Sequence, residues 1–527
     1  MWIRPCRKHV RLLFFAAGLL SFALWVVLLV SVANDNNNNN NSNNHDIVAF
    51  QPLPIRPPGS VPSSPQHGRN HRRRAADETD EGGGPQSLIA ATPLQEVISQ
   101  APHQPKESRK HVSKEQYQKL VVEWQQLLSQ PDSDGKRHPP SQCRTKLDPR
   151  RAQRHLNLSR SPAFSSEGTN RTLPDIYVAL NLKDSAHLLP SMVMQLTSFM
   201  RMLGPERFFV SIYESGSNDQ TVELLRRWGE LLRKLGIAHF FAHGNNVSRK
   251  HGEHRINFLA MVRNLALAPL RSHQHSPANH RYDRIIFSND VVFCASDVLE
   301  MLHQSYLQKA DMTCAIDYNF DTVPGFYDTW VGRDLNGDGF QREPVNAFVQ
   351  HAESNLLLQQ GLPFQVSCCW NGLVVLRAEP FYQPHPASTA KGGELQFRRE
   401  RSEEIFPPDP RYYYIQHYYE GMQAYSQCSA SEVNVLCKDM IYLGYSRFMV
   451  VPFAKAAYTR TNHDILRTKL YRLSVPFSPL EDKEIAFVPP PKTMFCDPMN
   501  GNTVHIPDAP RGRVFLPQQK DALNAIP

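Results

Sequence analysis

The segment YDRIIFSNDVVF (282–293) places an acidic turn, Asn289 and Asp290, directly after a hydrophobic run. A run of this kind predicts a buried strand, so the turn should lie at the edge of a sheet. There the Asp290 carboxylate can hold a divalent cation that neutralises a diphosphate, with the Asn289 amide oxygen as a weaker ligand. The alternative is an Asx turn that ends the strand and binds nothing.

The elements around this turn predict an α/β fold. Expected strands lie at 175–182, 207–213, 239–242, 282–287 and 311–317, and expected helices lie at 191–203, 217–235, 255–268 and 297–308. This alternation is typical of a mainly parallel central sheet with helices on both faces. Ligands bind such sheets beyond the carboxyl ends of the strands, so polar residues that follow a strand are the candidates for a site.

Polar residues do follow the first two expected strands. Asn181 ends the first, and Glu214, Ser215 and Asp219 follow the second within YESGSNDQT (213–221). This segment resembles the acidic turn that contacts the nucleotide donor and caps the next helix in transferases of the GT-A fold. The alternative is that Asp219 caps the helix without binding a ligand.

A second donor-binding candidate lies within a helical run. RINFLAMVRNLAL (255–267) carries Arg263 and Asn264 upstream of the acidic turn. Such an Arg-Asn pair is similar to the donor-binding helix of the same fold. The alternative is an exposed helix face whose Asn is satisfied by neighbouring groups.

Nucleic-acid binding and several enzyme classes are disfavoured by composition and motifs. The net charge of +8 comes from residues 1–173, with 23 basic against 14 acidic residues, whereas residues 174–527 have 35 against 36. A neutral main domain lacks the basic face that phosphate backbones require. The sequence has no Walker A, GxGxxG, GxSxG or HExxH motif. P-loop, dinucleotide-binding, serine hydrolase and zincin chemistry are therefore disfavoured.

The N-terminal region predicts a membrane anchor. Residues 12–33 are uncharged and would reach about 33 Å as a helix, enough to span a bilayer, and basic residues precede them. The alternative is a cleaved signal peptide. We expect a cytosolic tail (1–11), a transmembrane anchor (12–33), a low-complexity lumenal stem (34–173), a catalytic domain (174–500) and a C-terminal tail (501–527).

Cysteine usage agrees with a lumenal location. Eight cysteines follow Cys6, an even number that permits disulfides in an oxidising compartment, although sequence does not give the pairing. No CxxC pair occurs, which argues against a zinc site.

Taken together, these and further segments resemble the fungal capsule-associated α-1,3-mannosyltransferases, glycosyltransferase family 69. The segments that carry the resemblance are FFVSIYESGSNDQT (208–221), RINFLAMVRNLAL (255–267), IIFSNDVVFCASDVLEML (285–302), DMTCAIDY (311–318), GFYDTWVGRD (325–334), SCCWNGLVVLRAEPF (367–381) and SASEVNVLCKDM (429–440). They cover roughly residues 175–460.

This resemblance implies a GT-A-like, type II Golgi membrane enzyme. Its expected donor is GDP-mannose, its metal Mn²⁺ (or Mg²⁺), and its acceptor a mannan or oligosaccharide hydroxyl. Transfer would form an α-1,3 linkage with retention at the anomeric carbon. Ser288 occupies the first carboxylate position of the usual D-x-D motif, which leaves Asn289 and Asp290 as the expected metal ligands.

Four more residues become candidates by position. Asp317 or Glu432 would stabilise positive charge on the reacting sugar, and Trp370 and Asn371 would contact a sugar. Glu432 lies between Cys428 and Cys437, which we expect to bound its loop. The alternatives are a strand-ending cap for Asp317, a core indole for Trp370 and a solvated helix position for Glu432.

Three other functions remain open at this stage. The fold could use a different nucleotide-sugar donor, because no residue pattern distinguishes guanine from uracil. A degenerate transferase could act as a scaffold in polysaccharide assembly. A calcium loop could begin at Asp334 in DLNGDG (334–339), although its twelfth position is Val345 rather than an acid, which favours a polar turn.

Overall fold

The computed structural model describes the folded head and isolated positions before it. The described residues are 115–116, 119, 122–123, 126, 143, 148–160, 175–243, 247–249, 255–271, 281–320, 324–384, 394–398, 431–468, 477–496 and 512–515. No helix in this part of the chain is both long and apolar enough to span a bilayer. The anchor expected at 12–33 lies outside these residues.

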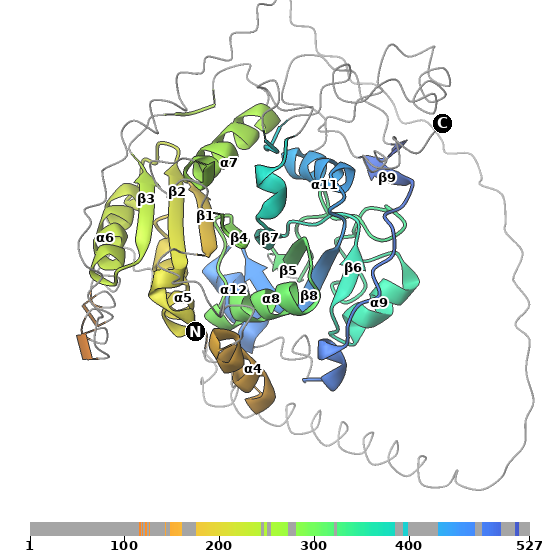
Figure 1. Ribbon diagram of the computed structural model, residues 1–527, viewed down its shortest axis with the longest axis horizontal. Coiled ribbons are helices and arrows are strands. Elements are labelled where there is room, and N and C mark those ends of the chain that lie inside the picture. The colour runs from red at the N-terminus through yellow and green to blue at the C-terminus, as the bar shows by residue number, and fades with distance from the viewer. Residues whose placement is uncertain are drawn as a thin grey trace, which may run out of the picture. The chain divides into compact units, whose positions relative to one another are not determined.

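Eight strands of the described chain form one sheet in the order β3-β2-β1-β4-β7-β5-β8-β6 (Figure 1). Their bounds are β1 (Ile176–Leu182), β2 (Phe208–Glu214), β3 (Ala238–Ala242), β4 (Arg284–Ser288), β5 (Met312–Tyr318), β6 (Phe364–Val366), β7 (Leu373–Arg377) and β8 (Phe448–Ala457). The expected α/β class is confirmed. A separate two-stranded ribbon pairs β9 (Thr493–Cys496) with β10 (Gly512–Phe515).

The sheet is mixed, which corrects the expectation of a mainly parallel one. β3, β2, β1 and β4 are parallel, and β5 is parallel to β8, but β7 runs antiparallel between β4 and β5, and β6 antiparallel to β8. Ser288, the last residue of β4, therefore pairs with Leu373, the first residue of β7. The segment that leads into β7 thus lies at the same edge as the carboxyl ends of β4, β5 and β8.

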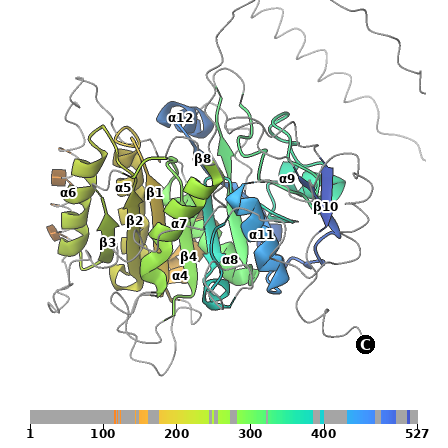
Figure 2. The same cartoon turned by 90° about the horizontal axis from the view of Figure 1, so that it is seen from above.

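Helices cover both faces of the sheet, as expected. They are α5 (Leu189–Leu203), α6 (Thr221–Lys234), α7 (Arg255–Arg271), α8 (Ala295–Leu307), α9 (Ala352–Gln359), α11 (Glu432–Tyr442) and α12 (Arg460–Thr468). Alternate residues of β1 enter different cores: Tyr177 belongs to the core that contains residues of α7 and α11, and Val178 to the core that contains residues of α5 and α8. Burial on both faces explains why these strands read as continuous apolar runs. Figure 2 shows α7 lying across the parallel strands.

Helix α4 (Pro149–Arg160) extends the head into the region expected to be a stem. The buried guanidinium of Arg154 bonds Glu300 of α8, and Glu481 and Asp482 of the 3-10 turn Pro479–Asp482, at 2.7 Å for the last two. A disulfide joins Cys143 to Cys294 just before α8. The ordered body therefore begins upstream of residue 174, because charges buried in α8 need partners from α4.

Replacement of Arg154 by alanine should lower the free energy of unfolding by about 3 kcal/mol, because it removes the buried guanidinium that Glu300 and Glu481 share and leaves each with one other basic partner, His155 or Arg151. The matched control is Arg150→Ala on the same helix, since Arg150 is exposed, pairs with partly exposed Asp148 and lies over the Phe477 ring. That change should cost at most about 1 kcal/mol. Urea unfolding of both variants measures the difference; equal midpoints would contradict the role of α4.

Candidate active site at the carboxyl edge of the sheet

Residues from four strands meet at one edge of the sheet around Asp290. Asp290 follows β4, and the next residues are tied to β8 through Val292, whose N–H donates to the Ala457 carbonyl at 2.8 Å. The Asn289 N–H donates to the Gly372 carbonyl at 2.8 Å, which fixes the start of β7 beside it. The turn therefore lies between the carboxyl ends of β5 and β8 and the start of β7, as the topology requires.

Arg263 of α7 holds this edge together. Its Nε donates to Oε1 of Glu432 at 2.8 Å, and a terminal nitrogen donates to Oδ1 of Asn289 at 3.1 Å. The guanidinium carbon also lies 4.6 Å from the centroid of the Trp370 ring, a cation–π contact. Arg263 and Glu432 are buried, so their charges neutralise each other inside the protein.

The hydrogen bonds of this cluster bear on three expected site residues: Glu432 as a catalytic acid, Arg263 as a donor-binding side chain and Asn289 as a metal ligand. The Glu432 carboxylate forms a buried ion pair with Arg263 and is therefore not free to contact a sugar. Arg263 is a clamp rather than an exposed donor-binding side chain. Asn289 Oδ1 accepts hydrogen bonds from both Arg263 and the Trp370 indole N–H (3.1 Å), so both of its lone pairs are used and a cation has none to bind.

The turn before β7 is a rigid brace rather than a sugar-binding surface. Trp370 is 2% exposed, and its ring packs against Phe287 and Phe397 with centroids 5.1 and 5.7 Å away. Asn371 is fully buried, adopts a positive φ of 55°, and donates from Nδ2 to the Ala315 carbonyl at 2.6 Å. The core indole is therefore the correct interpretation of Trp370, and Asn371 holds β5.

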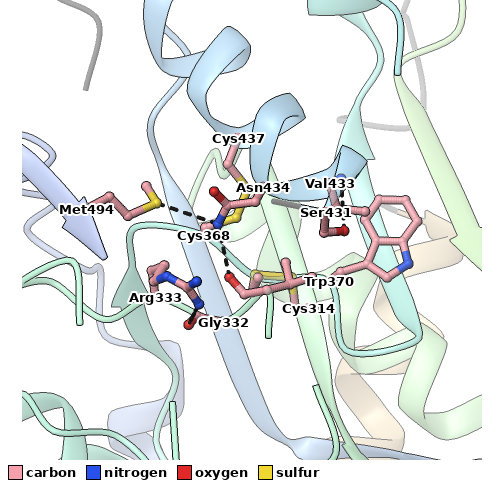
Figure 3. The surroundings of a disulfide bond; sticks show 12 residues. Cys314, Gly332, Arg333, Cys368, Trp370, Ser431, Val433, Asn434, Cys437 and Met494 are labelled. Carbon is pink, nitrogen blue, oxygen red and sulfur yellow. Dashed lines mark hydrogen bonds between the residues drawn. A yellow bond between two sulfur atoms is a disulfide. The ribbon is translucent and has the colours of Figure 1, made fainter. Parts of the chain in front are cut away.

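Two disulfides from consecutive cysteines anchor this turn. Cys369 bonds Cys314 in β5, and Cys368 bonds Cys437 in α11 (Figure 3). Cys437 thus pairs with Cys368, which corrects the expectation that Cys428 and Cys437 bound the loop of Glu432. The covalent links hold α11, and with it Glu432, against the sheet edge.

Two acids lie beside the turn, the fully buried Asp317 and the partly buried Asp328, and the sequence singled out only Asp317. Asp317 in β5 is fully buried, and its Oδ1 accepts the N–H of Asp328 at 3.2 Å. Asp328 in turn accepts the N–H of Asn371 at 3.0 Å. Burial, then the charge of Asp328, raises the pKa of Asp317 well above its usual range. Burial raises the pKa of Asp328 to about 6.

Asp290 suits a cation shared with a diphosphate. It is exposed, yet desolvation by the surrounding protein raises the pKa of its carboxyl, while His187 and Arg263 oppose the rise. An exposed carboxylate can bind Mn²⁺ or Mg²⁺. Such cations are often held by one or two protein carboxylates together with substrate phosphates. Within the described chain, the one group of three potential metal-ligating residues is Cys143, Cys294 and His463, whose cysteines form a disulfide.

The residues expected on the donor side divide into two sets. Asn181 donates from Nδ2 to the Val262 carbonyl at 2.6 Å, and its buried Oδ1 has no hydrogen-bond partner among the described residues, so it can still accept from a ligand. Glu214 is buried and accepts the N–H of Ser217; the Ser215 hydroxyl makes a 3.5 Å contact with the Leu182 carbonyl. These two residues shape the turn after β2.

Asp219 and Asn264 serve local structure. Asp219 accepts the N–H of Thr221, the first residue of α6, at 2.9 Å, and the N–H of Ala186 at 3.0 Å. Asn264 pairs through both amide atoms with the backbone of Phe397, at 2.7 and 2.9 Å. The cap interpretation of Asp219 and the satisfied-amide interpretation of Asn264 are therefore the better ones.

The segment 334–339 is a polar turn, as the sequence favoured. Asp334 is fully buried; its Oδ1 accepts the N–H groups of Asn336 and Asp338, and its Oδ2 accepts that of His351. The carboxylate is thus occupied by backbone donors from its own turn and the start of α9, an arrangement that leaves it no role as a calcium ligand.

Sequence reasoning missed Asp328, Tyr327 and Tyr458. Asp328 and Tyr327 lie in GFYDTWVGRD, which was quoted only for its resemblance, and Tyr458 directly follows β8. The signal that could have found the first two is an acid next to an aromatic residue in a loop. Their position at the site depends on the order of β7, β5 and β8, which the chain sequence alone does not reveal.

The Asp328 carboxyl should make stability depend on pH. Its pKa is about 6 in the fold against 3.8 for the unfolded chain, so the folded state keeps a proton that the unfolded state has lost. The stabilisation is fully present below pH 3.8 and is lost as pH rises to about 6, by roughly 3 kcal/mol. Relative to the wild type, Asp328→Asn should therefore gain stability between pH 4 and 7. Urea unfolding at several pH values measures the difference, and a constant offset would contradict it.

Comparison with known proteins identifies relatives of this chain. The family model described as Cryptococcal mannosyltransferase 1 matches residues 175–439. Alpha-1,3-mannosyltransferase CMT1 of Cryptococcus neoformans is 29% identical over 347 residues, which cover 61% of this chain and 68% of the relative.

Solved structures resemble the chain only loosely. Mannosyltransferase PcManGT from Pyrobaculum calidifontis, solved in complex with GDP-Man and Mn²⁺, is 10% identical with a TM-score of 0.28, over 63% of this chain and 77% of that one. S. aureus TarS 1-349 is 11% identical with a TM-score of 0.27, over 54% of this chain and 60% of that one. Similarity this low carries no conclusion about ligands.

The family match begins at the first strand and ends within α11, so it includes Asp290, Arg263, the turn before β7 and Glu432, whereas β8 and Tyr458 lie beyond its end. It spans half of the chain, and the cryptococcal relative is itself a mannosyltransferase. The chain therefore belongs to the cryptococcal mannosyltransferase family and is a mannosyltransferase enzyme.

Proposed function

We propose that the enzyme transfers mannose from GDP-mannose to a hydroxyl of a mannose-containing glycan, forming an α-1,3 linkage with retention at the anomeric carbon. The α-1,3 linkage is proposed from the name of the cryptococcal relative. The donor and the stereochemistry come from the family resemblance. The observation that carries the proposal is the exposed Asp290 carboxylate at the sheet edge, between the donor-side turns and the acids Asp317 and Asp328.

Asp290 would hold the divalent cation, Mn²⁺ or Mg²⁺, together with the donor diphosphate. When bound, the cation neutralises the charge that develops on the departing GDP. Burial raises the pKa of Asp290, and His187 and Arg263 oppose the rise and so favour the ionised form that a cation ligand must have. Asn289 is a positioning residue in this account, because its bonds to Arg263 and Trp370 fix the backbone that carries Asp290.

The transfer itself needs no strong base from the protein. The bond from the anomeric carbon to the phosphate breaks, a bond to the acceptor oxygen forms, and the acceptor proton passes to the leaving phosphate. Negative charge near the sugar would favour its positively charged transition state. With Glu432 paired and the pKa of Asp317 well raised, Asp328 is the neighbouring acid that can ionise near neutral pH.

We also propose that the head works in the secretory lumen, as a type II protein of the Golgi membrane. Three disulfides among the described residues support an oxidising compartment, because such bonds are rare in the cytosol. The membrane anchor at 12–33 remains a prediction from the sequence.

Replacement of Asp290 by alanine should abolish transfer from GDP-mannose, a loss of about 10³-fold or more, because the cation and the diphosphate lose their protein carboxylate. GDP release and glycan product, measured with Mn²⁺ and an α-mannoside acceptor, report the loss. The fold should persist because Asp290 is exposed, and an unchanged melting temperature checks this.

The matched control is Glu353→Ala, which removes an exposed carboxylate in the first turn of α9 and should leave turnover unchanged. Retention of transfer by the Asp290 variant would remove the metal role. Turnover of another nucleotide sugar, but not of GDP-mannose, would show that the proposed donor is wrong.

A further inference from the structure

Tyr327 is an exposed aromatic side chain beside the acids Asp317 and Asp328. It keeps 43% of its surface exposed, although Phe326 before it is fully buried. The next residue, Asp328, is held by the N–H of Asn371. A single exposed tyrosine does not by itself require a ligand, but one that lies next to the acids at the carboxyl edge of the sheet is placed to contact a bound sugar.

The backbone presents this ring rigidly. The Tyr327 N–H donates to the Asp317 carbonyl at 3.1 Å, and its carbonyl accepts the N–H of Thr329 at 2.8 Å. Phe326 pairs with Tyr318 at the end of β5 and stacks on Phe348 with centroids 4.4 Å apart. Because Phe326 is fixed in the core, Tyr327 has little freedom to follow it inward.

Tyr458 supports the ring from beneath. The two tyrosine rings lie 4.2 Å apart between centroids, inclined by 48°. Burial, together with the charges of Asp317 and Asp328, raises the pKa of the Tyr458 hydroxyl well above its usual range, and a hydrogen bond with Asn289 opposes the rise. Tyr458 therefore lies close to Asp317, Asp328 and the turn at Asn289, and the more exposed Tyr327 ring packs against it.

The charges around Tyr327 are mainly negative. Burial and then the acids Asp317, Asp328 and Asp290 raise the pKa of the Tyr327 hydroxyl, and Arg255 opposes the rise. Polarised C–H groups of a sugar carry partial positive charge and suit the negative face of an aromatic ring. Sugar hydroxyls can donate hydrogen bonds to carboxylates. The same carboxylates would repel an anionic sugar.

We propose that Tyr327, supported by Tyr458, is the platform on which a neutral pyranose ring of the acceptor glycan stacks. The inference deepens the proposed function and rests on it for the identity of the site. It assigns to Tyr327 the sugar contact that the sequence had suggested for Trp370. It also predicts that the acceptor unit at this platform is uncharged.

Direct binding tests the platform without any need for turnover. Ligand-observed NMR would measure the dissociation constant of an α-linked mannobiose for the full head with its disulfides intact. Tyr327→Ala should weaken binding roughly tenfold, whereas Tyr327→Trp, which keeps an aromatic face, should stay within about threefold of wild type. The matched control is Leu356→Ala, which removes an exposed apolar side chain from α9 and should leave binding unchanged.

A charged ligand and kinetics sharpen the test. At pH 7.5 a glucuronic acid disaccharide should bind at least tenfold more weakly than the mannobiose, because the ionised Asp328 carboxylate would repel the carboxylate of the uronate. In transfer assays with GDP-mannose, Tyr327→Ala should raise the KM for the acceptor more than the KM for the donor.

Each outcome decides between the claims. Equal mannobiose binding by wild type and Tyr327→Ala, or no binding by the wild type, would overturn the platform. Tighter binding of the uronate would overturn its neutral character. Mannobiose binding that depends on Tyr327, without turnover of GDP-mannose, would uphold the platform and reject the proposed donor.

Discussion

The buried guanidinium of Arg263 fixes the geometry of the sheet edge. It joins helix α7 to Glu432 of α11, to the turn after β4 through Asn289, and to the turn before β7 through the face of Trp370. A buried cation is tolerated only with an anion and hydrogen-bond acceptors around it, so these segments can meet in few other ways. The bonds of Asn289 to Arg263 and Trp370 fix the turn from which the exposed Asp290 carboxylate projects.

The antiparallel strand β7 gives the site its second half. In an all-parallel sheet the segment before β7 would lie at the opposite edge from the carboxyl end of β4. Here its reversed direction places Trp370 and Asn371 beside Asn289, and two disulfides fasten this turn to β5 and α11. Asn371 then holds Asp328 next to Asp317, so the acids depend on the same turn as the proposed cation ligand.

The sequence predicted local features well and long-range partnerships poorly. The strands that end at Asn181, Glu214 and near Asp290 follow from apolar runs and polar turns, which are properties of neighbouring residues. Glu432 was misjudged because its partner Arg263 lies 169 residues away, and a charge in a helix reads as solvated until its partner is known. Likewise, residues 149–160 fall within the stem that the sequence predicts, because their arginines form ion pairs with Glu300 and Glu481, which lie far away in the chain.

The central claim is that Asp290 holds a divalent cation together with the donor diphosphate. Electron paramagnetic resonance of Mn²⁺, titrated into the head with and without GDP, measures this directly, because free Mn²⁺ gives a strong signal that binding suppresses. The account predicts tight Mn²⁺ binding when GDP is present, weaker binding without it, and loss of the GDP-dependent part in Asp290→Ala. Mn²⁺ binding that needs neither GDP nor Asp290 would contradict the account.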